Sequence, residues 1–441
     1  MSQTNEPVIL HRSSHAISRK DIDPDALKVL YRLSRSGHKA YLVGGAVRDL
    51  LLGKKPKDFD VATDARPGQI KKLFANCFLI GRRFRLAHIR FRGGKVIEVA
   101  TFRREPDPTE EADADLHNTF GSPAEDAFRR DITINSLFYD ITTFSVIDYT
   151  GGLRDIAQRR VCIIGDPEVR YTEDPVRMVR VLRHAARHGF SIEHRTARAI
   201  QEKRELLKTC SGSRMYEEFN KDLHSGCAAP IFSLLMQYSL LSTMLGEVGG
   251  VIEQNRESRE ELLRLLGVLD KAVRSGQPPV PTIAYALLLR PWVRMVMDRD
   301  AGRIPDRIKY LTDVLAASGM GVVIPKAIRM NALHSLEILE HMFSALQSGR
   351  MRWSLEKKAS YQDAAMLFTL ITQGRVSDGM EAFREAFRER FPEARTSDRR
   401  RKRRRRRGRK RSPEATSPVS GGGDAHGTAG AELQCAFFHQ W

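Results

Sequence analysis

The first 150 residues contain short apolar segments with two different spacings. Residues 24–36 place apolar side chains at the spacing of an amphipathic helix, with Asp23 as a cap before it and Gly37 as a stop after it. Four segments have the pattern of strands: 40–43, 58–63, 87–91 and 96–102. Between them, 46–52 and 67–75 have the pattern of helices. Residues 1–155 are therefore predicted to form an α/β domain with a small mixed sheet and helices.

The remainder of the chain has the pattern of helices. Beyond about residue 173, apolar side chains recur three or four positions apart, most clearly over 176–188 and 259–273. After Phe391 the sequence becomes Arg-rich and then rich in Gly, Ser, Pro and Ala, a composition that cannot bury a core. The predicted organisation is an α/β head, a helical neck, a helical body and a disordered basic tail: 1–155, 156–225, 226–392 and 393–441.

The net positive charge of the chain indicates a class of binding partner. The chain has 441 residues and a formal net charge of +19, and 12 of its 73 Lys and Arg lie in the segment 399–411. Without that segment and the tail after it, which carries three acidic residues, the charge is still +10. Because the folded part is basic in its own right, we expect a polyanionic partner, most simply a nucleic acid.

Other classes of protein are disfavoured by features that the sequence lacks. No apolar run reaches the roughly 18–20 residues of a membrane helix, and the N-terminal residues have no apolar signal core. The five cysteines are scattered without a CxxC pair, which argues against a zinc ribbon and fits a reducing compartment. We therefore expect a cytoplasmic protein without a membrane partner.

A glycine pair is the first candidate for chemistry. The chain has neither a GxxxxGK[ST] loop nor a GxGxxG after a strand, but it has Gly44-Gly45 between a predicted strand and a short helix. Two residues without side chains let a phosphate approach the backbone N–H groups at a helix start, and Arg48 one turn later can add a charge. The alternative is a glycine turn that only begins a helix.

Two aspartates follow the glycine pair. In a strand, Asp58 and Asp60 point to the same face while Phe59 points into the core. Two carboxylates this close disfavour each other unless a divalent cation lies between them, as in two-metal phosphoryl transfer. The pair is therefore a candidate Mg²⁺ site.

A third carboxylate has two candidates. Glu98 alternates with Ile97 and Val99 and so points away from them on a strand that should neighbour the aspartates. Asp131 follows the arginine pair at 129–130 and could complete the metal site or hold a ribose hydroxyl. For Glu98 the alternative is a surface charge on an edge strand.

A later helix offers groups that could read a base. Asp174, Arg177 and Arg180 are three positions apart and are predicted to line one helix face. A carboxylate and a guanidinium together present acceptors and donors that can match a base edge. The alternative for the two arginines is an ordinary solvated face.

Five motifs in this order, over roughly residues 15–225, resemble the class II nucleotidyltransferases: GGAVRD, DFD, EVATFR, RRDITINSLFYD and YTEDPVRMVRVLRHAA. This family comprises bacterial poly(A) polymerases and CCA-adding enzymes. The resemblance implies a nucleotidyltransferase head followed by helical regions, with the RNA-binding region expected in the helical body, 226–392. It also implies residue roles, with nucleotide contacts from Gly44, Gly45 and Arg48, Mg²⁺ binding by Asp58 and Asp60, ribose and phosphate contacts from Arg130 and Asp131, base recognition by Glu173, Asp174 and Arg177, and a phosphate contact from Arg180.

Within the family, the segment 79–91 (LIGRRFRLAHIRF) is similar to the poly(A) polymerase pattern. We therefore expect two Mg²⁺ ions to assist attack of an RNA 3′-hydroxyl on the α-phosphate of ATP, adding AMP to mRNA, regulatory RNA or decaying RNA and promoting its turnover. Proteins of RNA degradation are candidate partners. The RNA contacts are predicted at arginines of that segment and at the tail: Arg82, Arg83, Arg399, Arg400, Arg401, Lys402 and Arg403. Alternatives are a CCA-adding enzyme and a non-catalytic RNA-binding protein.

Overall fold

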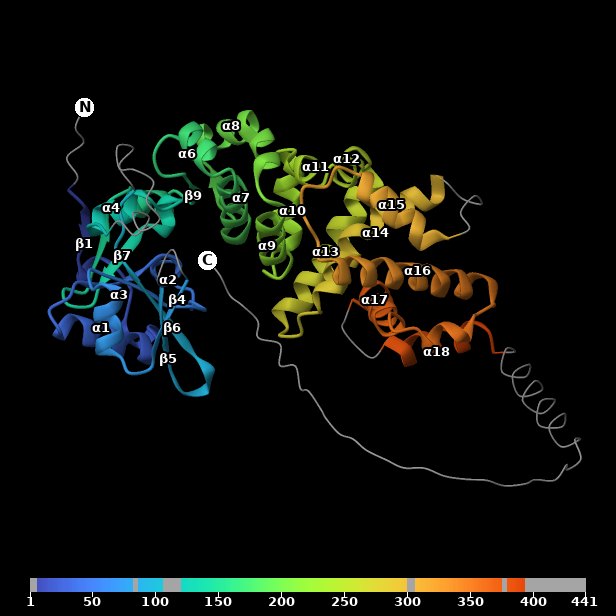
Figure 1. Ribbon diagram of the computed structural model, residues 1–441, viewed down its shortest axis with the longest axis horizontal. Helices are drawn as coiled ribbons and strands as arrows, with labels where there is room; N and C mark the ends of the chain where they lie inside the picture. The colour runs from blue at the N-terminus through green and yellow to red at the C-terminus, as the bar shows by residue number, and fades with distance from the viewer. Residues whose placement is uncertain (1–5, 82–85, 106–119, 300–305, 375–378, 393–441) are drawn as a thin grey trace, which may run out of the picture. The chain divides into compact units, whose positions relative to one another are not determined.

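A mixed sheet of eight strands forms the N-terminal part of the chain in the computed structural model, which describes residues 6–81, 86–105, 120–299, 306–374 and 379–392 (Figure 1). The strand order is β1-β8-β7-β2-β3-β6-β5-β4, and only β3 and β6 pair in parallel. The strands are β1 Val8–Leu10, β2 Ala40–Val43, β3 Asp60–Thr63, β4 Cys77–Ile80, β5 Leu86–Arg90, β6 Val96–Thr101, β7 Leu137–Asp140 and β8 Ser145–Asp148.

Helices cover this sheet because each has one apolar side. The helix α1 buries Ala26, Val29, Leu30 and Leu33 completely, and Asp23 caps it by accepting hydrogen bonds from the N–H groups of residues 25 and 26. A smaller cluster that includes Phe102 and Phe138 packs separately from the main core. The helices of this part are α1 Pro24–Arg35, α2 Gly45–Leu51, α3 Pro67–Leu73, α4 Pro123–Phe128 and α5 Gly152–Ala157.

The sequence pattern located the central elements of the head and missed others. The predicted helices and strands appear with ends shifted by up to two residues; β3 begins at Asp60, so Asp58 and Phe59 precede it. The strands β1, β4, β7 and β8 were not predicted from periodicity; β1 and β4 lie at the sheet edges. Most of the predicted polar loop 104–120 lies outside the described residues.

A short helical region follows the sheet. A two-stranded parallel ladder joins the segment before α6 to the segment between α7 and α8: β9 Arg160–Val161 pairs with β10 Ser191–Ile192, which was not predicted. The helix α7 spans the predicted 176–188 and ends at Gly189, which has a φ of +63°. The helices here are α6 Pro167–Glu173, α7 Val176–His188, α8 His194–Lys203 and α9 Gly212–Leu223.

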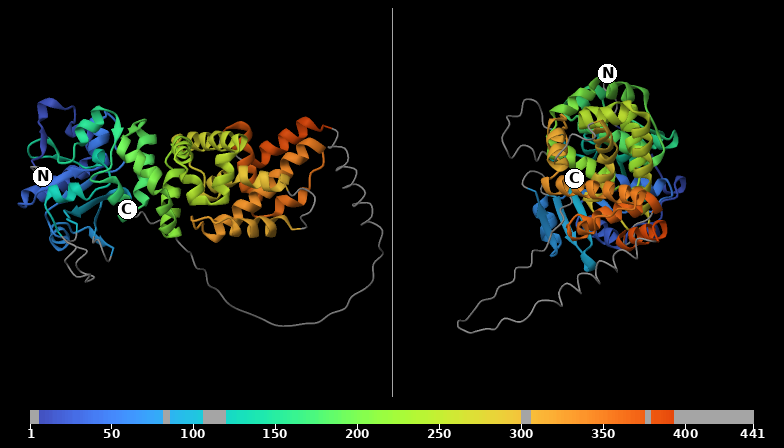
Figure 2. Two further views of the ribbon diagram at one scale, coloured as in Figure 1. Left: turned by 90° about the horizontal axis from the view of Figure 1, so that it is seen from above. Right: turned by 90° about the vertical axis from the view of Figure 1, so that its right-hand side faces the viewer.

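The regular elements among the remaining described residues are helices, and the views in Figure 2 show long strands only in the blue to teal part of the chain. The helices are α10 Ala228–Gln237, α11 Leu240–Leu245, α12 Glu247–Gln254, α13 Arg256–Arg274, α14 Pro281–Arg299, α15 Arg307–Ala317, α16 Lys326–Ser348, α17 Tyr361–Gln373 and α18 Gly379–Arg390. Within the described ranges, none of them combines the length and apolar character needed to cross a membrane.

Candidate active site

Two strands bring three carboxylates together at one end of the sheet. Asp60 opens β3, and Glu98 lies level with it on β6, because the parallel register pairs Val61 with Val99 one residue further along. Asp58 is exposed just before β3, and the buried Phe59 between the aspartates joins the core. The predicted alternation therefore holds although Asp58 lies outside the strand.

The electrostatics of Asp60 reflect this crowding. Burial, the charge of Glu98 and the charge of Asp58 raise its pKa to about 7, while Arg130 opposes the shift. Glu98 also lies 3.4 Å, Oε1 to Nε2, from His88, its register partner on β5. A cation at this place would relieve the repulsion among the carboxylates.

Carboxylate oxygens are the donors that Mg²⁺ prefers, so the chemistry of this group suits the ion. In the part of the chain that the structure describes, however, no group of three or more His, Cys, Asp or Glu side chains is placed to hold a metal ion. Asp58 and Asp60 thus stay the predicted ligands, on the chemistry of their side chains.

The glycine pair forms the turn between β2 and α2, as predicted. Gly44 has a φ of +71°, and a Cβ added to it would lie 3.5 Å from Nη1 of Arg130. A Cβ on Gly45 would lie 3.3 Å from Nη2 of Arg48. Two guanidinium groups thus lie against a turn that has no side chains of its own.

The two arginines, Arg48 and Arg130, differ in their exposure to solvent and in their partners. Arg48 is only 3% exposed, and its guanidinium donates to Asp49 and to the side chain of Asn135. These buried contacts stabilise the glycine turn. The predicted direct charge at the helix start is therefore largely neutralised by Asp49. Arg130 is more exposed and is oriented by Asp126, which accepts from its Nη2 at 2.8 Å.

Asp126 was not predicted as a site residue. It is 2% exposed and accepts from both Arg129 and Arg130, whose charges lower its pKa although burial alone would raise it. Its spacing of three and four residues from the arginine pair, on a helix, is a signal that the sequence offered.

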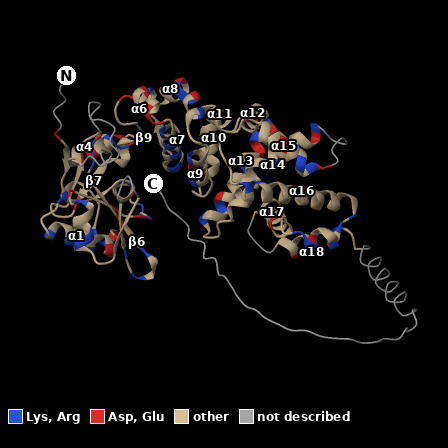
Figure 3. Cartoon of the chain, viewed as in Figure 1, with Lys and Arg blue, Asp and Glu red and all other residues tan. Residues whose placement is uncertain are grey.

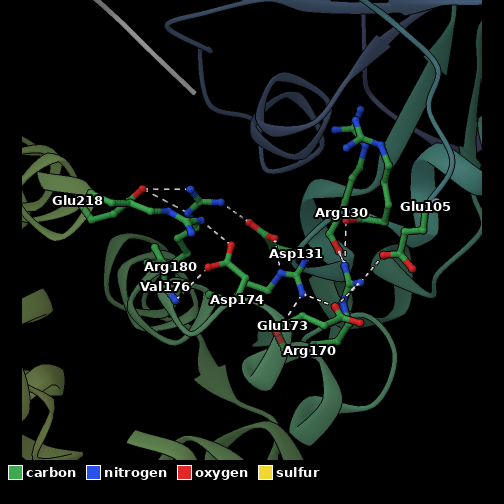
Figure 4. Close-up of polar contacts among 12 residues, drawn as sticks. Glu105, Arg130, Asp131, Arg170, Glu173, Asp174, Val176, Arg180 and Glu218 are labelled. Atoms are coloured by element: carbon green, nitrogen blue, oxygen red, sulfur yellow. Dashed lines mark hydrogen bonds and ion pairs between the residues drawn. The ribbon is translucent and has the colours of Figure 1, made fainter. Parts of the chain in front are cut away.

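Asp131 is paired with two arginines of α7. Its two oxygens accept from Nε of Arg177 at 3.0 Å and from Nη1 of Arg180 at 2.8 Å (Figure 4). Burial would raise its pKa, but the charges of Arg180 and Arg177 lower it. Of the two candidates for a third carboxylate, the structure thus places Glu98 beside Asp60 and ties Asp131 to α7.

The predicted single helix face of Asp174, Arg177 and Arg180 is wrong. Asp174 ends α6 in an extended conformation, with φ −147° and ψ 92°, because Pro175 after it begins α7 and disfavours a helical residue before it. Its carboxylate accepts from the N–H of Val176 and, at 2.6 Å, from Arg214 of α9. The base-reading candidates are therefore a turn residue and the first turn of a helix.

Glu173 and the arginines of α7 are held by further ion pairs. Glu173 accepts from Arg177 at 2.9 Å. Glu218 on α9, which is 2% exposed, accepts from Arg180 at 3.1 Å and forms an ion pair with Arg183 at 2.6 Å. Figure 3 shows how basic positions gather along α7. Glu218 was not predicted: its two arginine partners lie 38 and 35 residues away, and the only neighbour along the chain that these contacts include is Lys221, three residues further on.

The predicted RNA contacts cannot be placed. Arg82, Arg83 and the tail residues Arg399, Arg400, Arg401, Lys402 and Arg403 lie outside the described residues.

The turn, the carboxylates and the arginine-rich junction define the class of protein as a nucleotidyltransferase, which comparison with known proteins confirms. The Poly A polymerase head domain family matches residues 40–162, and the family described as the probable RNA and SrmB-binding site of polymerase A matches residues 189–248. A solved CCA-adding enzyme of Bacillus stearothermophilus in complex with CTP is similar with a TM-score of 0.60 and 26% identity, covering 84% of this chain and 83% of that one.

Curated relatives narrow the class further. The chain is 38% identical to poly(A) polymerase I of Salmonella typhi over 384 residues, which cover 83% of this chain and 82% of that protein. It is 32% identical to the CCA-adding enzyme of Bacillus velezensis over 263 residues, 57% of this chain and 66% of that protein. The chain belongs to the family of bacterial poly(A) polymerase I, and it is an enzyme, as predicted.

Proposed function

We propose that this enzyme adds AMP from ATP to RNA 3′ ends without a template and releases pyrophosphate. The observation that carries the proposal is the 38% identity to poly(A) polymerase I over four fifths of both chains. The promotion of RNA turnover, the cytoplasmic location and partners among RNA-degrading proteins stay predictions.

The site suits a nucleoside triphosphate. The side-chain-free turn at Gly44-Gly45, with Arg130 beside it, supports a role in holding the phosphates, and Arg48 supports the turn from below. We assign recognition of the base to Asp174 and Arg177, because a carboxylate and a guanidinium can match the donors and acceptors of a base edge. Asp131 orients both Arg177 and Arg180, so we assign it to positioning the nucleotide.

Asp58 and Asp60, with Glu98 beside them, would hold the Mg²⁺. When bound, the ion supplies positive charge for phosphoryl transfer. The raised pKa of Asp60 supports this assignment, because a cation would restore its ionised form. The basic charge of the chain and the RNA-binding description of the family at residues 189–248 support RNA as the acceptor.

Alanine substitution of either aspartate tests the proposal. Asp58→Ala and Asp60→Ala should abolish AMP incorporation, by at least about a thousandfold, while leaving RNA affinity nearly unchanged. Asp64→Ala is the matched control, because Asp64 directly follows β3, four residues beyond Asp60, and pairs with His38. Full turnover by either of the first two variants would show that the carboxylates have another role.

The related CCA-adding enzymes make the second candidate function a tRNA nucleotidyltransferase. ATP and CTP should be supplied separately to tRNA that lacks its 3′ end and to a generic RNA. A long ladder from ATP alone on generic RNA supports the proposal, whereas addition limited to CTP and one ATP on tRNA supports the alternative. Absence of any Mg²⁺-dependent pyrophosphate release would instead favour a non-catalytic RNA-binding protein.

A further inference from the structure

Arg170 is a buried arginine at the junction of the head and the helices that no motif assigned. It lies in α6 and is 6% exposed, and its Nη2 donates to two main-chain carbonyl oxygens, at 2.9 Å to that of Arg129 and at 3.1 Å to that of Arg130 (Figure 4). These carbonyls directly precede Asp131 in the chain. One guanidinium thus holds the backbone that carries two proposed nucleotide-binding residues.

The same residue also holds the base-reading arginine. Its Nη1 donates to Glu173 at 3.1 Å and to Glu105, and its own carbonyl accepts from Nη1 of Arg177 at 2.9 Å. Glu173 accepts from Arg177 as well, at 2.9 Å. Arg170 therefore contacts the head backbone on one side and Arg177 on the other.

These contacts close a ring. Asp131 is ion-paired with Arg177, and Arg177 donates a hydrogen bond to the carbonyl of Arg170. The Arg170 side chain in turn donates to the carbonyl of Arg130, the residue directly before Asp131. A closed ring of charge-assisted bonds restricts Arg177 more than one ion pair could, because each bond limits the geometry of the next.

We infer that Arg170 is a positioning residue that fixes Arg177 for recognition of the incoming base, and the inference rests on the proposed nucleotide site. Glu173 and Glu105 have side chains 46% and 57% exposed, so those ion pairs contribute little, and the two part-buried bonds to the main-chain carbonyls carry the effect. A lysine keeps the charge but lacks the planar fork that reaches two carbonyls and a carboxylate at once.

The test compares Arg170→Lys with a control arginine in the full-length chain. Arg290 is also 6% exposed and is ion-paired with Glu261 and Glu340 in the helical body, so Arg290→Lys measures the cost of losing a buried guanidinium elsewhere. Steady-state kcat and KM are measured for ATP and for CTP on one RNA primer, with the melting temperature of each variant.

We expect Arg170→Lys to lower kcat/KM for ATP about tenfold, mainly through KM, and to lower the ATP-to-CTP ratio by a similar factor. Arg290→Lys should lower the melting temperature without changing the ratio. A ratio within about twofold of wild type for Arg170→Lys, or an equal change for Arg290→Lys, would overturn the inference.

Two further measurements keep this result separate from the proposed function. If Arg170→Lys does not fold, Arg170→Gln replaces it: one amide group cannot reach both carbonyls and the carboxylate, so the ratio should shift in the same direction, and an unchanged ratio would overturn the inference. If the wild-type enzyme adds no AMP to RNA, the proposed function fails, but equilibrium binding of ATP and CTP still tests the inference: Arg170→Lys must lose ATP preference, and an unchanged preference refutes it.

Discussion

The ion pairs of Glu218 lead to a quantitative prediction. Burial alone would raise the pKa of this carboxyl, but the charges of Arg183 and Arg180 hold it at about 2, against an ordinary value of 4.5. At about 1.4 kcal/mol per pKa unit, the shift corresponds to about 3 kcal/mol of stability near neutral pH. This agrees with the usual cost of breaking one partner out of a buried ion pair.

The variant is Glu218→Gln, and Glu217→Gln is its control because Glu217 is exposed on the same helix. A chain with several domains need not unfold in a single two-state transition. The local free energy of opening is therefore measured directly by hydrogen exchange of the α7 and α9 amides, and urea unfolding supports it. At pH 7 the first variant should lose about 3 kcal/mol of protection in these helices, and the control should stay within about 0.5 kcal/mol of wild type.

The stabilisation by Glu218 should depend on pH in one direction. A carboxyl with a lowered folded-state pKa stabilises the protein above its ordinary pKa and loses that effect as the pH falls toward the folded value. With 4.5 and about 2, about a quarter of the difference between Glu218→Gln and wild type should be gone at pH 4. An equal difference at pH 4 and pH 7, or an equal loss in the control, would refute the reasoning.

Two more changes have defined outcomes. Gly246 has a φ of +56°, and a Cβ there would meet the carbonyl oxygen of Ser318 at 2.1 Å, so Gly246→Ala should lower stability by more than about 2 kcal/mol. Gly250 lies in helix α12 with open space where a Cβ would be, so Gly250→Ala should raise the stability by about 0.5–1 kcal/mol. Thermal melts of the two variants measure the shifts, and equal shifts would contradict the steric argument. Deletion of 399–441 should weaken RNA affinity and flatten its salt dependence while sparing AMP addition at saturating primer; unchanged affinity at low salt would show that the tail serves something else.

The features that the sequence predicted well are those set by neighbours along the chain. The helix α1 follows from its cap at Asp23 and its apolar spacing, and α7 follows from 13 residues of strong periodicity. The glycine turn and the alternation around Phe59 are also local, so they were found correctly. Asp174 was misplaced because a helical spacing was extended across Pro175, whose effect on the residue before it outweighs the spacing.

The partners of the charged residues were decided by tertiary structure. The sequence alone left Glu98 and Asp131 as equal candidates, and only the parallel register of β3 and β6 brings Glu98 beside Asp60. Asp131 meets its arginines 46 and 49 residues away, and Arg170 reaches carbonyls 40 and 41 residues before it. By itself the sequence thus determined the local elements, the ordered motifs and the family, because these depend on spacing along the chain. The pairing of the charges required the fold, because a side chain's partner is set by which distant segments pack against it.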